Sequence, residues 1–155
     1  MAKRNLPIGI EFYKKVIDEA YFYVDKTLII KELLDRQSYV NLFTRPRRFG
    51  KTLALDMLKT FFEDEIDEKG NTIDNSRYFA DKKIMDAGNQ YIQHMGRYPV
   101  IYLSFKSSKQ ADWDTTFWMI KMTIADSLSS RLAAHSSISM WMAKWKWDVG
   151  NGKTS

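Results

Sequence analysis

The feature that most constrains this chain is the sequence RPRRFGKT, residues 45–52, which separates a short apolar segment from an amphipathic one. Loops that grip phosphate lie between a strand and a helix, because the helix N-terminus leaves backbone amides unpaired and carries partial positive charge. In such loops Gly lets the backbone approach the phosphates, Lys reaches their oxygens, and Thr offers a hydroxyl to Mg²⁺. The pattern therefore predicts a strand, a phosphate-binding loop and a helix in that order.

The two segments beside the loop have the periodicities that this arrangement needs. SYVNLFT, residues 38–44, is rich in β-branched and aromatic residues and stops before a proline, which predicts a buried strand. The segment that begins at about Lys51 predicts a helix, because its apolar residues recur at helical spacing; they are Leu53, Leu55, Met57, Leu58, Phe61 and Phe62. RYPVIYLSF, residues 97–105, predicts a second strand that is covered on both faces.

Further helices are predicted over residues 25–36, 79–95 and 113–132, each from its apolar periodicity. Asp25 is a candidate N-cap for the first of them. The acidic and polar stretch 63–76 predicts an exposed loop with a solvated helix end. Strands alternating with helices predict an α/β fold: a parallel sheet flanked by helices, like that of P-loop nucleoside triphosphatases.

Individual residues of the loop can be given expected roles. Gly50 permits close approach of the backbone, Lys51 supplies the phosphate-binding ammonium, and Thr52 supplies a hydroxyl to Mg²⁺ carried by the nucleotide. Arg45 stands where such loops have their first glycine, and Pro46 has no N–H to donate. The predicted nucleotide-binding residues are therefore Arg47, Arg48, Phe49, Gly50, Lys51, Thr52 and Leu53.

The tripeptide alone is weak evidence, because a second copy, GNGKT, occupies residues 150–154. That copy has Trp147 at the first-glycine position, follows no strand pattern and precedes no helix pattern. With no helix to donate amides, we interpret it as part of a tail. The context, rather than the tripeptide, therefore favours Lys51.

Three ordered motifs resemble the AAA-ATPase-like family of bacterial proteins over about residues 5–125. They read LPIGIEFYKKVIDEAYFYVDKT, then NLFTRPRRFGKTLALDMLKTFFE, then YPVIYLSFK. In that family Arg is usual at the position of Arg45. The resemblance implies that ATP and Mg²⁺ are bound, with phosphate contacts at Gly50 and Lys51 and Mg²⁺ at Thr52. It also places residues 25–27 near the site without a defined role.

The family also carries a strand ending in an acidic residue, which holds Mg²⁺ and orients the attacking water. The one candidate here, VIYLSFK, ends in Ser104, Phe105 and Lys106. We therefore expect ATP binding with little or no turnover, and no catalytic residue is assigned. From residue 127 onward the family pattern is lost. Residues 1–126 are accordingly interpreted as the N-terminal part of the ATPase-like domain, and 127–155 as an atypical helical or irregular tail of a truncated chain.

Two other interpretations remain open at this point. The net charge of +5 favours anionic partners, so the chain could be a basic module in which Arg45, Arg47, Arg48 and Lys51 contact nucleic-acid phosphates, with affinity that falls steeply with salt. Alternatively it could be a truncated fragment with no function of its own. No apolar run has the length of a membrane span, no signal sequence is visible and there is no Cys, so a cytoplasmic bacterial protein is expected.

Two remaining signals have structural interpretations. Near the C-terminus, apolar residues recur at helical spacing; they are Ile138, Trp141, Met142 and Trp145. This spacing favours a helix that packs on the domain over a basic helix that lies on a membrane surface. His94 and His135 are isolated from other ligand types, so no metal is predicted beyond nucleotide-borne Mg²⁺.

Overall fold

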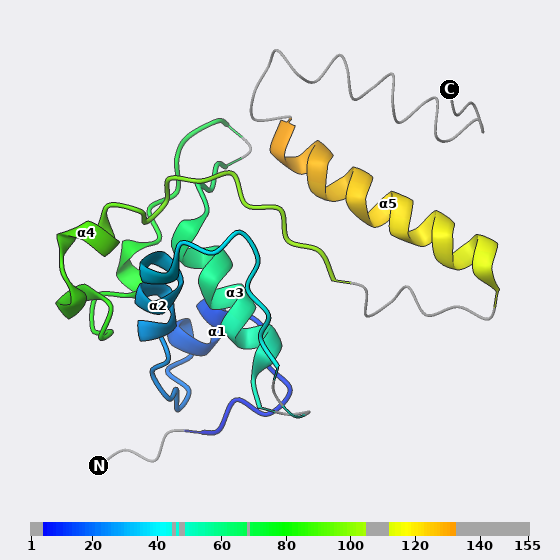
Figure 1. The fold of residues 1–155 in the computed structure, drawn as a ribbon. Coiled ribbons are helices and arrows are strands. Elements are labelled where there is room, and N and C mark those ends of the chain that lie inside the picture. Colours follow the sequence, from blue (N-terminus) through cyan, green and yellow to red (C-terminus); the bar gives the residue numbers. More distant parts are fainter. Residues whose placement is uncertain (1–4, 45, 47–48, 68, 105–111, 133–155) are drawn as a thin grey trace. The chain divides into compact units, whose positions relative to one another are not determined.

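The computed structural model describes residues 5–44, 46, 49–67, 69–104 and 112–132. The helices are α1 (Tyr13–Asp18), α2 (Leu28–Arg36), α3 (Lys51–Phe62), α4 (Asn89–Ile92) and α5 (Trp113–Leu132), with 3₁₀ turns η1 (Ser76–Tyr78) and η2 (Met85–Ala87) (Figure 1). The chain divides into two compact units. The first contains α1 to α4 with both 3₁₀ turns, and the second contains α5 and the short stretch 66–71.

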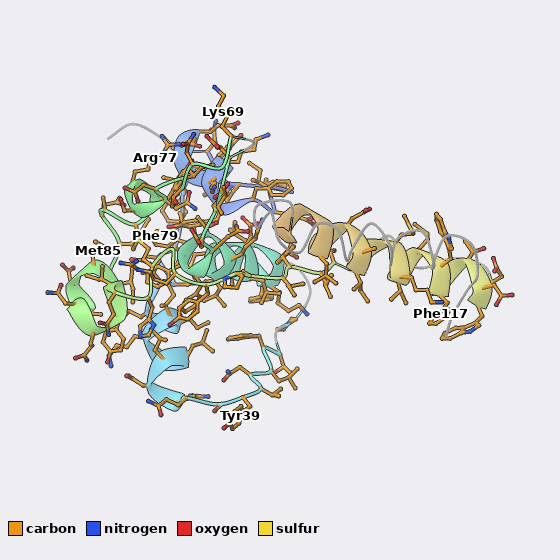
Figure 2. The ribbon with its side chains drawn as sticks, turned by 90° about the horizontal axis from the view of Figure 1, so that it is seen from above. Tyr39, Lys69, Arg77, Phe79, Met85 and Phe117 are labelled. Carbon is orange, nitrogen blue, oxygen red and sulfur yellow. The ribbon has the colours of Figure 1, made fainter. Side chains whose placement is uncertain are left out.

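The predicted parallel sheet is wrong, because the described residues form no strand and no sheet. Residues 38–44 run without regular structure, and Val40 and Leu42 are 85% and 84% exposed; Figure 2 shows Tyr39 projecting outward from this segment. The second predicted strand contributes an isolated parallel bridge between Glu63 and Tyr98. Strand propensity describes how a residue fits a paired, half-buried surface, so without a partner these segments do not become strands.

The helix predictions have a mixed outcome. The helices expected over 25–36, from Lys51 onward and over 113–132 are confirmed as α2, α3 and α5, although α2 begins at Leu28. The helix expected over 79–95 is wrong: this segment contains η2 and the four-residue α4. Gly88, with φ 120° and ψ 155°, interrupts it in a conformation that side-chain-bearing residues rarely adopt.

The core of the first unit is a cluster of aromatic and aliphatic side chains from segments far apart in the sequence. The rings of Phe61 and Phe79 meet edge to face with centroids 5.2 Å apart, and Tyr13 lies 5.3 Å from Phe79. The buried cluster comprises Tyr13, Ile30, Met57, Phe61, Tyr78, Phe79, Ile84 and Tyr91. Because α3 contributes two of its members, the orientation of this helix is set by the side chains on its buried face.

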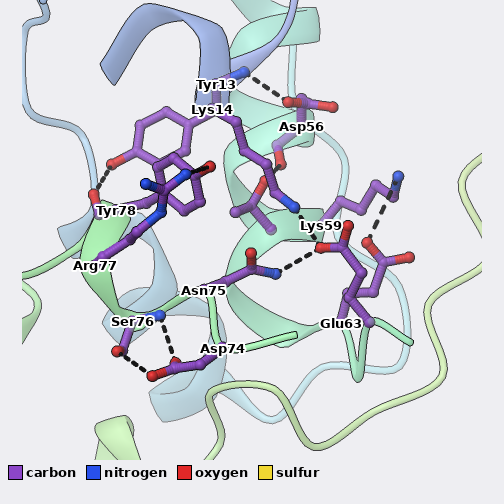
Figure 3. Close-up of polar contacts among 12 residues, drawn as sticks. Tyr13, Lys14, Asp56, Lys59, Glu63, Asp74, Asn75, Ser76, Arg77 and Tyr78 are labelled. Atoms are coloured by element: carbon purple, nitrogen blue, oxygen red, sulfur yellow. Dashed lines mark hydrogen bonds and ion pairs between the residues drawn. The ribbon is translucent and has the colours of Figure 1, made fainter. Parts of the chain in front are cut away.

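Helix α1 adds polar contacts that hold α3 in place (Figure 3). The backbone amide of Tyr13 donates a 2.6 Å hydrogen bond to the carboxylate of Asp56, in the middle of α3. The Tyr13 hydroxyl donates to the carbonyl of Tyr78 at 2.9 Å. A residue at the start of α1 thus ties α3 to the η1 turn.

In the parts of the chain described above, no helix combines the length and the apolar character required to cross a bilayer. The predicted C-terminal packing helix and His135 lie outside the described residues, as does most of the predicted tail 127–155. The division at residue 126 therefore stays a prediction.

Candidate functional site

The N-terminus of α3 lies where the sequence predicts it. Gly50 is the N-cap residue and has φ 70° and ψ 33°, a left-handed conformation that Gly adopts at little cost. The amide of Ala54 donates the first hydrogen bond of the helix, at 2.9 Å, to the carbonyl of Gly50. The amides of the first turn precede that bond and point out of the helix end. A 12-residue helix therefore begins directly after the glycine.

The side chains of this end are largely accessible. Phe49, Lys51 and Thr52 are exposed, whereas Leu53 is half-buried and packs against the core cluster. The first turn of α3 contains no acidic residue. The structure thus brings residues 49–53 together at one accessible, electropositive helix end. Of the other predicted site residues, Arg47 and Arg48 lie outside the described residues.

A residue from a distant part of the chain reaches the same place. The ammonium of Lys26 lies 3.9 Å from the position that a Cβ atom on Gly50 would occupy. The family resemblance places residues 25–27 near the site but gives Lys26 no role. The signal that could have pointed to it is its place in YVDKT, a motif whose three polar residues begin a predicted helix.

Asp25 fixes the turn that carries Lys26. One carboxylate oxygen of Asp25 accepts hydrogen bonds from the amide and the hydroxyl of Thr27, at 2.8 and 2.7 Å. The other accepts the amide of Lys83 at 2.8 Å. Burial opposes ionisation of Asp25, but these hydrogen bonds outweigh it and hold its pKa below the ordinary value. The predicted N-cap role is corrected in one respect: Thr27 is the N-cap of α2, and Asp25 braces the turn before it.

Further contacts anchor the two sides of this turn. Thr27 is fully buried, and its hydroxyl accepts the amide of Ile84 at 3.2 Å. On the other side, the backbone of Lys26 hydrogen-bonds to Tyr23. Burial, opposed by that hydrogen bond, raises the pKa of Tyr23 to about 12. The backbone of Lys26 is therefore held on both sides, while its side chain extends toward Gly50.

The acidic stretch after α3 is less exposed than predicted. Glu63 is only 7% exposed and pairs with Lys59 at 3.5 Å. Glu65 pairs with Lys14 and accepts the side-chain amide of Asn75 at 2.7 Å (Figure 3). Burial alone would raise the pKa of Glu65, but the hydrogen bonds from Lys14 and Asn75 have the larger effect and hold the pKa below its ordinary value. The carboxylates of Glu63 and Glu65 thus stabilise the C-terminal end of α3 through these contacts. The prediction of a solvated helix end is wrong for these two residues.

Two other features lie apart from the helix end. A cavity of about 360 Å³ lies between α2 and residues 38–43, and none of residues 49–53 lines it. The ring of His94 stacks on Tyr98, with centroids 5.8 Å apart. Over the described ranges, no three His, Cys, Asp or Glu side chains gather in a way that could hold a metal ion. The N-terminal end of α3 is therefore the candidate site.

Comparison with known proteins adds the following. The sequence model of a protein family described as predicted AAA-ATPase, the AAA-ATPase-like family, matches residues 7–146. A relative from Azotobacter chroococcum mcd 1, described as an uncharacterized protein in the vnfD 5′ region, is 43% identical over 63 residues. Those residues are 40% of this chain and 12% of the relative, so the chain spans only a small part of that protein's length. No solved structure matches the chain.

Proposed function

The chain belongs to the AAA-ATPase-like family, and from this membership we propose that it binds ATP with its Mg²⁺ through residues 47–53. One observation carries the proposal: Gly50 caps α3 in a left-handed conformation and is followed at once by Lys51 and Thr52, both exposed, at a helix end with no acidic residue in its first turn. This is the arrangement of groups that binds phosphate at helix N-termini.

The proposed contacts divide between backbone and side chains. Amides of the first turn of α3 donate to phosphate oxygens, supported by the partial positive charge of the helix end. Lys51 adds a charge-assisted hydrogen bond, which is stronger than one between neutral groups. Gly50 has no side chain to keep the phosphates away from the backbone.

The residues at the helix end are better suited to bind a cation that arrives with the nucleotide than to bind a metal ion on their own. Thr52 supplies a hydroxyl next to the phosphate-binding amides, and the remaining ligands would be phosphate oxygens and water. When bound, Mg²⁺ neutralises part of the phosphate charge. We propose ATP binding only. That the chain hydrolyses ATP little or not at all stays a prediction from the sequence.

The test is calorimetric titration of Mg-ATP and Mg-ADP into the full chain and into Lys51→Ala. We expect saturable binding by the wild type and at least about tenfold weaker binding by the variant, because one charge-assisted contact is lost. Lys15→Ala is the control: Lys15 is exposed on α1 and pairs with Glu19 at 3.7 Å, an interaction of small energetic value. It should bind like the wild type.

A competition arm separates this proposal from the basic nucleic-acid-binding alternative. Short DNA should not displace Mg-ATP from the loop site, and nucleotide affinity should not fall with the steep salt dependence of backbone-phosphate binding. Displacement by DNA, or equal binding by Lys51→Ala and the wild type, would contradict the proposal. Absence of any nucleotide binding by a chain that melts cooperatively would contradict it too.

A further inference from the structure

We infer that Lys26 is a second phosphate-binding cation of this site, an inference that rests on the proposed nucleotide binding at Lys51. Lys26 is half-buried, and its ammonium lies 3.9 Å from the position of a Cβ atom on Gly50. It therefore lies beside the backbone of the residue that caps α3. The ligand class it would contact is the polyphosphate of the nucleotide, not the base.

The electrostatics of the helix end support this role. A helix N-terminus carries partial positive charge and repels a cation. Lys26 nevertheless approaches this end, and the first turn of α3 contains no acidic residue. The approach of a cation to this helix end is unfavourable by itself and becomes favourable when an anion with several charges lies beside Lys26.

Other lysines of the first unit are used differently. Ion pairs join Lys14, Lys31, Lys59 and Lys82 to nearby carboxylates. No ion pair between described residues includes Lys26. Its placement at the positive end of α3 is thus not explained by a carboxylate in the described part of the chain, whereas a bound polyphosphate would explain it.

The turn that carries Lys26 is held by hydrogen bonds, so the backbone of Lys26 has a fixed position. Asp25 accepts hydrogen bonds from Thr27 and from the amide of Lys83, and the buried Thr27 hydroxyl accepts the amide of Ile84. The main chain at Lys26 is therefore fixed before any ligand arrives. A fixed main chain lowers the total entropy cost of binding, because only the side chain has to be ordered on the ligand.

A purely structural role would have Lys26 cover Gly50 with its aliphatic stem, as long charged side chains often do. Lys26→Met separates the two roles, because it keeps an unbranched apolar stem of similar length and removes the charge. Lys26→Arg keeps the charge. Lys83→Met is the matched control: Lys83 is exposed and contacts the same turn through its backbone amide, which the substitution retains.

The experiment titrates Mg-ATP and inorganic tripolyphosphate into the full chain and these variants. For Lys26→Met we expect affinity for both ligands to fall about 10- to 100-fold, the effect of losing a hydrogen bond from a charged group. Lys26→Arg should stay within a few-fold of the wild type, and Lys83→Met should match it. The melting temperature of ligand-free Lys26→Met should be unchanged or higher, because a repulsive charge has been removed, while its increase with Mg-ATP should shrink.

Two results would overturn the inference, and they are distinguishable. If the wild type binds Mg-ATP, Lys51→Ala loses it and Lys26→Met keeps it, the proposed site stands and Lys26 is not part of it. If the wild type does not bind Mg-ATP, the proposed function fails and the inference fails with it. In the first of these cases, a lower melting temperature for Lys26→Met would assign Lys26 to packing alone.

Discussion

At the scale of single residues, the same side-chain chemistry serves different purposes according to what surrounds it. The carboxylate of Asp25 accepts hydrogen bonds from two backbone amides, and its pKa is lowered. Asp56 also accepts a backbone amide, that of Tyr13, but burial dominates and raises its pKa. Two differences account for this: Asp56 is more deeply buried than Asp25, and it accepts one backbone hydrogen bond where Asp25 accepts several hydrogen bonds.

The raised pKa of Asp56 predicts a pH dependence of stability. Its main cause is burial, opposed by the Tyr13 amide and by the charges of Lys59 and Lys14, and reinforced by Glu65. When the folded-state pKa of a group is raised, its contribution to stability is complete below the unfolded-state pKa, here 3.8, and is lost as the pH rises through the folded value. Asp56→Asn keeps an oxygen that accepts the Tyr13 amide, but Asn does not ionise, so the variant does not lose this stability as the pH rises.

We therefore expect the free energy of unfolding of the wild type, relative to Asp56→Asn, to fall as the pH rises from below 3.8 toward neutrality. Urea unfolding across this range measures it. Asp74→Asn is a control of opposite sign, because hydrogen bonds from the amide and hydroxyl of Ser76 lower the pKa of Asp74. A wild-type advantage over Asp56→Asn that grows with pH would show that the ionised carboxylate stabilises the fold.

At the scale of elements, α3 and residues 38–44 show what an apolar pattern can and cannot specify. α3 satisfies its own backbone through hydrogen bonds within the helix, and one face of it packs into the core. Residues 38–44 have an equally apolar sequence, but a strand satisfies its backbone only through a neighbouring strand. With no such neighbour among the described residues, this segment stays irregular and exposes its apolar side chains.

Hydrogen exchange should separate these two elements. Amides of residues 39–43 should exchange at nearly the rate of an unfolded chain, because they lie in exposed irregular backbone. Amides of residues 56–62, in the buried half of α3, should exchange orders of magnitude more slowly. The comparison is internal, because both elements belong to the first unit. Strong protection over 39–43 would mean that the segment is paired as a strand.

At the scale of the whole molecule, stability of the first unit depends on a core assembled from α1, α2, α3, α4 and the turns between α3 and α4. The helices within it are short: α1 has 6 residues, α2 has 9 and α3 has 12. Isolated helices of this length are marginal in water. Their packing against one another therefore decides whether the candidate site at the start of α3 exists.

Removing a central ring should accordingly destabilise the unit as a whole. Phe61 is fully buried and touches Phe62 and Phe79 edge to face. Phe61→Ala should lower the free energy of unfolding by about 3 to 5 kcal/mol, as measured by urea denaturation followed by far-ultraviolet circular dichroism. Phe22→Ala removes the same atoms from a side chain that is 50% exposed and should cost about 1 kcal/mol or less. Similar losses for both variants would contradict this assignment of the core.

The amino-acid sequence by itself determined the features that depend on neighbours along the chain. Helical periodicity located α2, α3 and α5, and Gly50 followed by Lys51 located the N-terminus of α3. Ordered motifs were enough to indicate the family. These predictions succeed because a helix forms its hydrogen bonds within one segment and its start is marked by the residue that caps it.

The tertiary structure decided what depends on contacts between distant segments. It left residues 38–44 without a strand partner, buried Glu63, and made Asp25 a brace for Lys83. It also brought Lys26 to Gly50, which no spacing in the sequence encodes. Strand pairing, burial of charge and the approach of Lys26 to Gly50 all require segments far apart in the chain to pack together. Their outcome is therefore a property of the folded core and not of any local pattern.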